Sequence, residues 1–90
     1  MLQSGSKVVV QRPTKPSKYF VDNFCAAIKR ARVNAGLTQE DMAKNLGIPR
    51  GSYDNYENRS LMPLHLIGRF CMYTDTTLVQ LFDQANNPPS

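Results

Sequence analysis

The feature that most constrains the fold is the stretch Leu46-Gly47-Ile48-Pro49, which predicts a tight turn between two short helices. Gly47 can adopt the left-handed backbone conformation that ends a helix, because it carries no Cβ atom. Pro49 has a φ angle already suited to the start of the next helix, where an amide hydrogen is not needed. Ile48 is expected to anchor the turn in the core.

The residues on both sides of this turn recur at helical spacing. Thr38 is a favoured N-cap residue, and the polar and acidic side chains after it suit the positive end of a helix dipole. The apolar edge of this helix should comprise Met42, Ala43 and Leu46. In the next helix, Tyr53 and Tyr56 are expected on the inward face. Two short helices joined by so short a turn are typical of a helix-turn-helix unit.

The segment resembles the phage repressor and Cro type of helix-turn-helix, also called the Xre family. The matching residues are Leu37 to Ala43, Leu46 to Ile48, Tyr53, and Tyr56 to Asn58. Upstream, Arg32 stands where the family has an arginine that pairs with the glutamate numbered Glu57 here. Downstream, residues 70–82 fit the last two helices of the family. The resemblance extends over about residues 22–82 and implies a DNA-binding function.

The resemblance implies an all-α fold: a five-helix phage-repressor-like helix-turn-helix domain with a non-helical basic N-terminal arm. We expect the arm at residues 1–21, the helix-turn-helix DNA-binding domain at residues 22–84 and a polar C-terminal tail at residues 85–90. Asp22 should cap the first helix, Pro63 should open the fourth and Thr77 should cap the fifth. Apolar stripes should comprise Phe24, Ile28, Ala31 and Ala35 in the first helix, with Cys25 beside them, and Leu64, Ile67, Phe70 and Cys71 in the fourth.

The net charge of +4 is concentrated in the arm. Residues 22–90 contain seven basic and seven acidic residues, whereas residues 1–21 contain no acid and four basic residues, Lys7, Arg12, Lys15 and Lys18. A basic segment suggests a polyanionic partner, although composition alone does not separate a nucleic-acid contact from a solubilising tail. Three roles are open for the arm: contact with DNA phosphates or a minor groove, pairing of a strand at residues 7–11 with a partner subunit, or no role.

The exposed face of the second helix of the pair, helix three of the family, carries the expected contacts with DNA bases. Arg50 can donate two hydrogen bonds to guanine, and Asn55 can bridge the polar groups of adenine. Ser52 is short enough to reach a base edge or a phosphate, and Gly51 would let the backbone approach closely. The expected phosphate contacts, which fix register without reading sequence, come from Gln39, Lys44, Asn58 and Arg59. The family glutamine that Gln39 resembles also braces helix three.

The resemblance implies two further contacts, and the sequence differs from the family pattern at two turns. Arg32 and Glu57 should form a structural ion pair between the first and third helices. Leu78, Val79 and Phe82 are assigned to a two-fold dimer contact, because helix five has more apolar surface than a small core can bury. Arg59 stands where the family usually has glycine, and Thr74-Asp75-Thr76 replaces Leu-Gly-Val, so both turns are expected to differ from those of the family.

Other classes of protein find little support in the sequence. Cys25 and Cys71 lie in apolar helical patterns and are expected to be free thiols. Together with His65 they do not form a convincing metal set, so no metal or cofactor is expected. We find no nucleophile–base set and no phosphate-cradling glycine loop, so no catalytic residues and no enzyme are predicted. The apolar runs are too short for a signal peptide or a membrane span, which favours a cytoplasmic location.

The leading hypothesis is a sequence-specific regulator of transcription that binds double-stranded DNA as a homodimer on an inverted-repeat operator. Repression follows most simply, because no effector domain is visible. A phage or plasmid regulator, a controller of a restriction system and an antitoxin with a protein partner all fit. The alternative is a protein-interaction module on the same fold, with weak or no sequence-specific DNA readout. Asp54, Gly51 and the neutral domain leave this alternative open.

Overall fold

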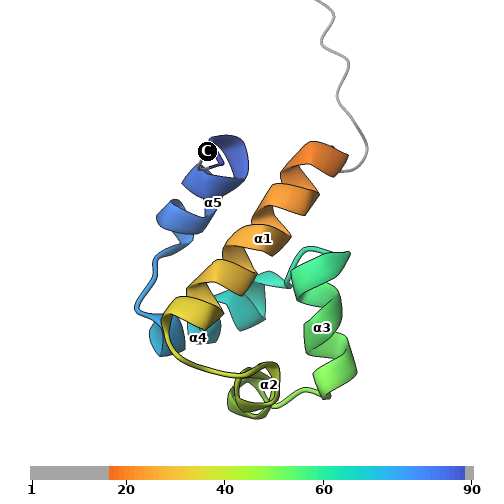
Figure 1. Ribbon diagram of the computed structural model, residues 1–90, viewed down its shortest axis with the longest axis vertical. Coiled ribbons are helices and arrows are strands. Elements are labelled where there is room, and N and C mark those ends of the chain that lie inside the picture. Colours follow the sequence, from red (N-terminus) through yellow and green to blue (C-terminus); the bar gives the residue numbers. More distant parts are fainter. Residues whose placement is uncertain (1–16, 89–90) are drawn as a thin grey trace, which may run out of the picture.

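The computed structural model describes residues 17–88, and these form five helices in chain order (Figure 1). Within that range there is no strand, which confirms the predicted all-α, five-helix fold class. The helices are α1 (Lys18–Asn34), α2 (Gln39–Leu46), α3 (Arg50–Asn58), α4 (Leu64–Thr74) and α5 (Leu78–Asn86). The arm residues Lys7, Arg12 and Lys15 and the possible strand at residues 7–11 lie outside the described residues.

Helix α1 begins earlier than the sequence predicts. Ser17 is its N-cap, and the Ser17 hydroxyl accepts a hydrogen bond from the amide of Phe20 at 3.1 Å. The prediction that Asp22 caps this helix was therefore wrong. Asp22 lies one turn inside α1, where its carboxylate pairs with Lys18 at 2.9 Å on the surface. Residues 18–21 are helical because Ser17 supplies a cap and Phe20 packs against the core, which extends the apolar stripe of α1 by one turn.

The core lies between the inward faces of all five helices. Its fully buried large side chains are Phe24, Ile28, Met42, Tyr53, Phe70 and Leu81. Two residues assigned to the core from the sequence are exposed. Ala35 follows the last residue of α1 as its C-cap. Leu64 opens α4 at the periphery, whereas Met62 and Leu66 on either side of it are buried. The thiols of Cys25, which is buried, and Cys71, which is half-buried, are both free.

The turn between α2 and α3 has the predicted chemistry. Thr38 caps α2 in a reciprocal box, in which its hydroxyl accepts from the amide of Asp41 at 3.0 Å and its own amide donates to the Asp41 carboxylate at 3.1 Å. Gly47 ends α2 in the left-handed conformation, with φ of 71°. Pro49, with φ of −63°, then directs the chain into α3. The amide of Ile48 donates to the Ala43 carbonyl at 3.0 Å, which closes the turn.

Two other turns accommodate residues that replace glycine. Arg59 does not adopt a left-handed conformation, because its φ is −134°. Instead, the amides of Arg59 and Ser60 both donate to the Asn55 carbonyl, at 2.8 and 2.9 Å. After α4, Asp75 takes the left-handed conformation with φ of 54°, which aspartate tolerates better than most residues do. Thr77 then caps α5 together with Gln80.

The helices place the α2–α3 pair and α5 at opposite ends of the molecule. Figure 1 shows α5 beside the N-terminal half of α1, and α2 and α3 together at the other end. Two side chains of α1 form hydrogen bonds with α5: Asn23 donates to the Ala85 carbonyl, and Arg30 donates to the Gln84 side chain. Because α3 packs against α1 and α2 through one side, its other side remains open at the surface.

Candidate nucleic-acid interface

Helix α3 presents a polar face to solvent. Its inward side is fixed by Tyr53 and Glu57, which are both buried. Gly51 and Asn55 lie one turn apart on the opposite side and are exposed, and Arg50 is exposed at the start of the helix. Ser52, the fourth residue expected to read bases, is half-buried. A Cβ atom added at Gly51 would meet no atom within 4 Å, so the fold itself does not require glycine at this position.

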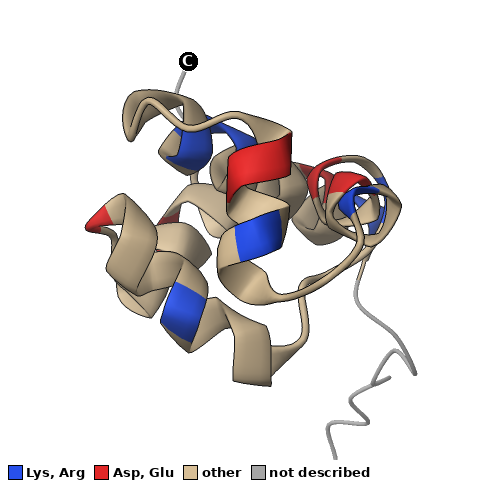
Figure 2. Ribbon diagram, turned by 90° about the horizontal axis from the view of Figure 1, so that it is seen from below, with Lys and Arg blue, Asp and Glu red and all other residues tan. Residues whose placement is uncertain are grey.

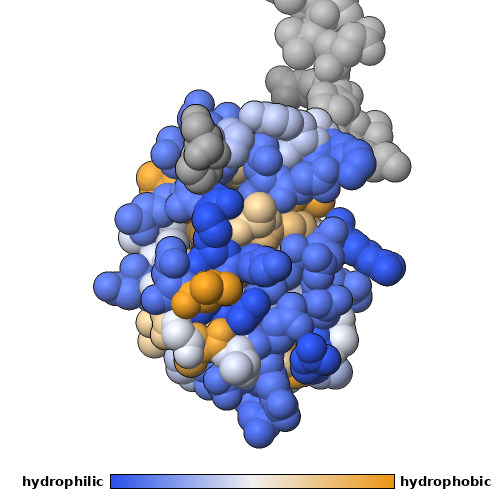
Figure 3. All heavy atoms as spheres, viewed as in Figure 1, coloured by the Kyte–Doolittle hydropathy of each residue, from blue (hydrophilic) through white to orange (hydrophobic). Residues whose placement is uncertain are grey.

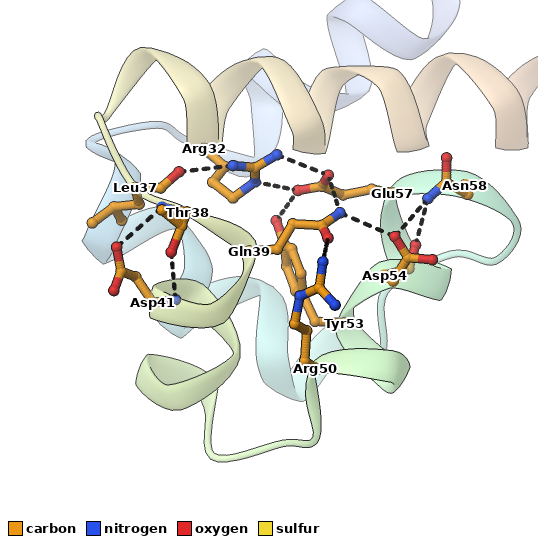
Figure 4. Close-up of polar contacts among 10 residues, drawn as sticks. All are labelled: Arg32, Leu37, Thr38, Gln39, Asp41, Arg50, Tyr53, Asp54, Glu57 and Asn58. Atoms are coloured by element: carbon orange, nitrogen blue, oxygen red, sulfur yellow. Dashed lines mark hydrogen bonds and ion pairs between the residues drawn. The ribbon is translucent and has the colours of Figure 1, made fainter.

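A buried carboxylate holds α3 in place. Glu57 Oε2 accepts from Arg32 Nε at 2.6 Å and from the Tyr53 hydroxyl, and Glu57 Oε1 accepts from Arg32 Nη2 at 3.2 Å and from Gln39 Nε2 at 3.0 Å (Figure 4). Arg32 also donates through Nη1 to the Leu37 carbonyl at 2.7 Å. The ion pair expected from the sequence is thus present, and the group that it forms connects α1, α2 and α3.

The environment of Glu57 favours its charged form. Burial alone would raise the pKa of this carboxyl group, but hydrogen bonds from Arg32, Tyr53 and Gln39 and the charge of Arg32 outweigh burial and lower it. The hydrogen bond with Glu57 is the main reason that the pKa of Arg32 is raised. Burial, followed by the contact with Glu57, raises the pKa of Tyr53. Near neutral pH the cluster therefore holds one carboxylate, one guanidinium and one neutral phenol.

Replacing Glu57 with glutamine should make stability less dependent on pH in the acid range. Because the pKa of Glu57 in the folded state lies below its ordinary value of 4.5, its stabilising effect is complete above about pH 4.5 and is lost as pH falls through the folded-state pKa. Urea unfolding at several pH values should show wild type more stable than Glu57→Gln at pH 7 and the gap narrowing below about pH 4.5. The matched control is Glu40→Gln, at an exposed carboxylate of α2. If the difference in the free energy of unfolding between wild type and Glu57→Gln stayed constant with pH, the lowered pKa of Glu57 in the folded state would be contradicted.

Gln39 connects this cluster to the exposed face of α3. Its Nε2 donates to Asp54 Oδ1 and to Glu57 Oε1, both at 3.0 Å, and its Oε1 accepts from Arg50 Nη2 at 3.1 Å (Figure 4). Asn58 Nδ2 donates to Asp54 Oδ1 at 3.0 Å and to the Asp54 carbonyl at 2.9 Å. Three residues predicted to contact DNA are therefore linked in one network, in which Gln39 bonds to Arg50 and Asp54 bonds to both Gln39 and Asn58.

Sequence reasoning did not predict the role of Asp54. From the sequence, Asp54 counted only as a feature that leaves the protein-interaction alternative open, whereas in the structure its carboxylate accepts hydrogen bonds from Gln39 and Asn58. The contact between Asn58 and Asp54 has a helical spacing of four residues that could have suggested it. The contact between Gln39 and Asp54 spans fifteen residues and two helices, and no periodic signal in the sequence indicates it.

The charged residues do not form one continuous basic face on the described helices. Figure 2 shows acidic and basic residues interspersed there. Lys44 and Arg59, two further candidates for phosphate contacts, are exposed in the last turn of α2 and just after α3. Lys18, the one basic residue of the arm in the described range, is exposed but paired with Asp22. Among the candidate base-reading residues, Arg50 at the start of α3 is the one that carries a positive charge.

The three residues assigned to a dimer contact differ in burial. Leu78 packs against the core, Phe82 is 44% exposed and Val79 is 76% exposed. The Phe82 ring lies 5.8 Å from the Phe20 ring and 5.7 Å from the Phe24 ring, measured between centroids. Figure 3 shows hydrophobic surface where α5 lies beside α1. Phe20 was missed in the sequence, because the arm was expected to extend past it.

The described residues contain neither a helix suited to crossing a membrane nor a candidate metal site. None of the five helices there combines the length and the hydrophobicity that a membrane crossing requires. In the same part of the chain, no group of three or more histidine, cysteine, aspartate or glutamate side chains is placed to hold a metal ion.

Comparisons with known proteins agree with this geometry. Residues 28–63 match the family model HTH_3, described as helix-turn-helix. The wild-type restriction-modification controller protein C.Esp1396I has a similar structure, with a TM-score of 0.64 and 19% identity over 79% of this chain and 94% of that chain. The clp gene regulator ClgR from C. glutamicum has a TM-score of 0.71 and 17% identity over 86% of this chain and 100% of that chain. At these identities the two structures show a shared fold. A comparison with curated proteins gave no significant match.

Proposed function

We propose that the chain is a DNA-binding transcriptional regulator that reads a specific DNA sequence with α3 in the major groove. The match of residues 28–63 to the helix-turn-helix family model HTH_3 supports this proposal. The observation that carries the proposal is the exposed face of α3. It places Arg50, Gly51 and Asn55 at the surface of a helix whose opposite side is held by the buried cluster around Glu57. A helix fits the major groove, where each base pair shows a distinct pattern of donors and acceptors.

Each candidate residue has a role that suits its chemistry. Arg50 has N–H groups for guanine, and Asn55 has a donor and an acceptor for adenine. Gly51 leaves space that the fold does not need, which suits a close approach of the DNA backbone or a base edge. Ser52 would bond a base edge or a phosphate. The phosphate contacts that fix register would come from Lys44, Asn58 and Arg59, and from the arm residues Lys7, Arg12, Lys15 and Lys18.

Regulation as a homodimer is the second part of the proposal. Val79 and the exposed part of Phe82 offer an apolar surface on α5, away from the α2–α3 pair. A two-fold contact there would present two copies of α3 to an inverted repeat, with half-sites about 34 Å apart. The similar structures are those of a restriction-modification controller and a clp gene regulator, which favours gene regulation over an antitoxin role. Occlusion of a promoter would then give repression.

Introducing a charge at the proposed dimer contact should produce monomers. Val79 is 76% exposed, so Val79→Glu should leave the fold stable while placing carboxylates against each other across a two-fold contact. The matched control is Met72→Glu, because Met72 is also a hydrophobic residue on the surface, 82% exposed on α4. Sedimentation velocity should show a dimer for wild type and for Met72→Glu, and a monomer for Val79→Glu. A dimer in all three proteins would place the contact elsewhere.

The test of DNA readout is selection from random-sequence duplexes, followed by fluorescence anisotropy at two salt concentrations. A specific regulator should enrich a palindromic site and bind it at least about a thousandfold more tightly than random duplexes. Its affinity should fall as salt rises, because phosphate contacts release counterions. Enrichment of no sequence would instead favour the protein-interaction module, and a search for a partner protein would follow.

A further inference from the structure

Arg50 and Asp54 are spaced to form an ion pair with each other, but the structure keeps them apart. They lie four residues apart on α3, a spacing at which oppositely charged side chains meet on a helix surface. The ion pairs of the described residues are those of Lys18 with Asp22 and of Arg32 with Glu57. Between Arg50 and Asp54 lies the side-chain amide of Gln39, which bonds to both.

The two carboxylates fix the orientation of this amide. Both hydrogens of Gln39 Nε2 have acceptors, Asp54 Oδ1 and Glu57 Oε1, each at 3.0 Å. The amide nitrogen must therefore face the carboxylates, and the carbonyl oxygen Oε1 must face the other way, where it accepts from Arg50 Nη2 at 3.1 Å. Figure 4 shows Gln39 in this intermediate position, with Arg50 on one side and Asp54 on the other.

We infer that Gln39 is a positioning residue that prevents Arg50 from pairing with Asp54 and so keeps the arginine available to DNA. A direct pair would draw the guanidinium toward the carboxylate, occupy up to two of its N–H groups and cancel its charge. In the observed arrangement the neutral amide oxygen of Gln39 accepts from Arg50 Nη2 alone. Arg50 Nε and Nη1 make no hydrogen bond within the described residues. The inference rests on the proposed function in one respect, namely that Arg50 contacts DNA.

The experiment is a double-mutant cycle between Gln39→Ala and Asp54→Asn, measured by anisotropy on the duplex that wild type selects. Gln39→Ala should weaken binding about tenfold, which corresponds to about 1.4 kcal/mol. Asp54→Asn removes the charge that could capture Arg50, so it should restore most of this loss in the Gln39→Ala background. In the wild-type background it should change affinity much less. Glu40→Ala, at the exposed neighbour of Gln39, is the matched control, and thermal melting checks that every variant is folded.

The comparison between backgrounds separates positioning from simpler effects. Loss of a phosphate contact by Gln39 itself, or a general repulsion of DNA by Asp54, would give the same gain from Asp54→Asn with and without Gln39. An equal gain in the two backgrounds would overturn the inference.

A second readout does not need DNA. The Nε–Hε NMR resonance of Arg50 should shift in Gln39→Ala and return toward its wild-type position when Asp54→Asn is added. If no duplex is selected, the proposed function fails and this resonance alone tests the positioning role. If the chemical shift of this resonance did not change when Asp54→Asn was added to Gln39→Ala, the positioning role would be overturned.

Discussion

Replacing Glu57 with alanine should lower the free energy of unfolding by about 3–5 kcal/mol, the loss typical of removing one partner from a buried ion pair. Glu57 is 5% exposed and accepts hydrogen bonds from Arg32, Tyr53 and Gln39. In its absence the Arg32 guanidinium would stay buried, with the Leu37 carbonyl as its remaining acceptor in the described contacts. In a domain of this size each kcal/mol corresponds to roughly 4–8 °C, so the melting temperature should fall by more than about 10 °C.

The control for this prediction is Asp54→Ala, three residues away on the same helix. Asp54 is half-buried, and its partners Gln39 and Asn58 are neutral amides, so its removal should cost only about 1 kcal/mol. Thermal and urea unfolding of the two variants compares the stability lost with the buried carboxylate of Glu57 and with the half-buried carboxylate of Asp54. Equal melting temperatures would mean that the cluster around Glu57 does not anchor α3.

The local chemistry of the turns could be predicted from the sequence because each feature depends on neighbouring residues. Gly47 ends α2 in the left-handed conformation, and Thr38 and Thr77 cap their helices, as expected. The start of α1 was misplaced because two acceptable caps, Ser17 and Asp22, lie five residues apart. Local propensity does not choose between them, whereas the packing of Phe20 on the core does.

The candidate site could be predicted only in part. The resemblance implied the pairing of Arg32 with Glu57, because both residues stand at family positions. The bridge from Arg50 through Gln39 to Asp54 depends instead on how α2 and α3 are placed relative to each other. Spacing within the chain suggests a different outcome, a direct pair between Arg50 and Asp54. The resemblance implied that Gln39 braces helix three, but it did not indicate the bonds to Arg50 and Asp54, which override the preference of the helix surface.

The double variant Arg50→Ala, Asn55→Ala should lose most of its preference for the selected site while remaining folded. Each bidentate contact with a base contributes about 1–3 kcal/mol of discrimination against other bases. Both side chains are exposed, and the one hydrogen bond of either side chain within the described residues is that of Arg50 with Gln39. Stability should therefore change little, in contrast to the effect of Glu57→Ala. In anisotropy measurements, the affinity of the double variant for the selected duplex should fall toward its affinity for random duplexes.

The salt dependence of this variant distinguishes base reading from electrostatic attraction. If Arg50 and Asn55 read bases, the variant should keep salt-dependent binding to any duplex, because Lys44, Arg59 and the arm still contact phosphates in the proposed complex. The matched control is Lys44→Ala, which should weaken binding to all duplexes about equally and reduce the salt slope by about 1. If the double variant kept the full preference of wild type for the selected site, α3 would not be the reading helix, and the base contacts would have to come from another part of the chain.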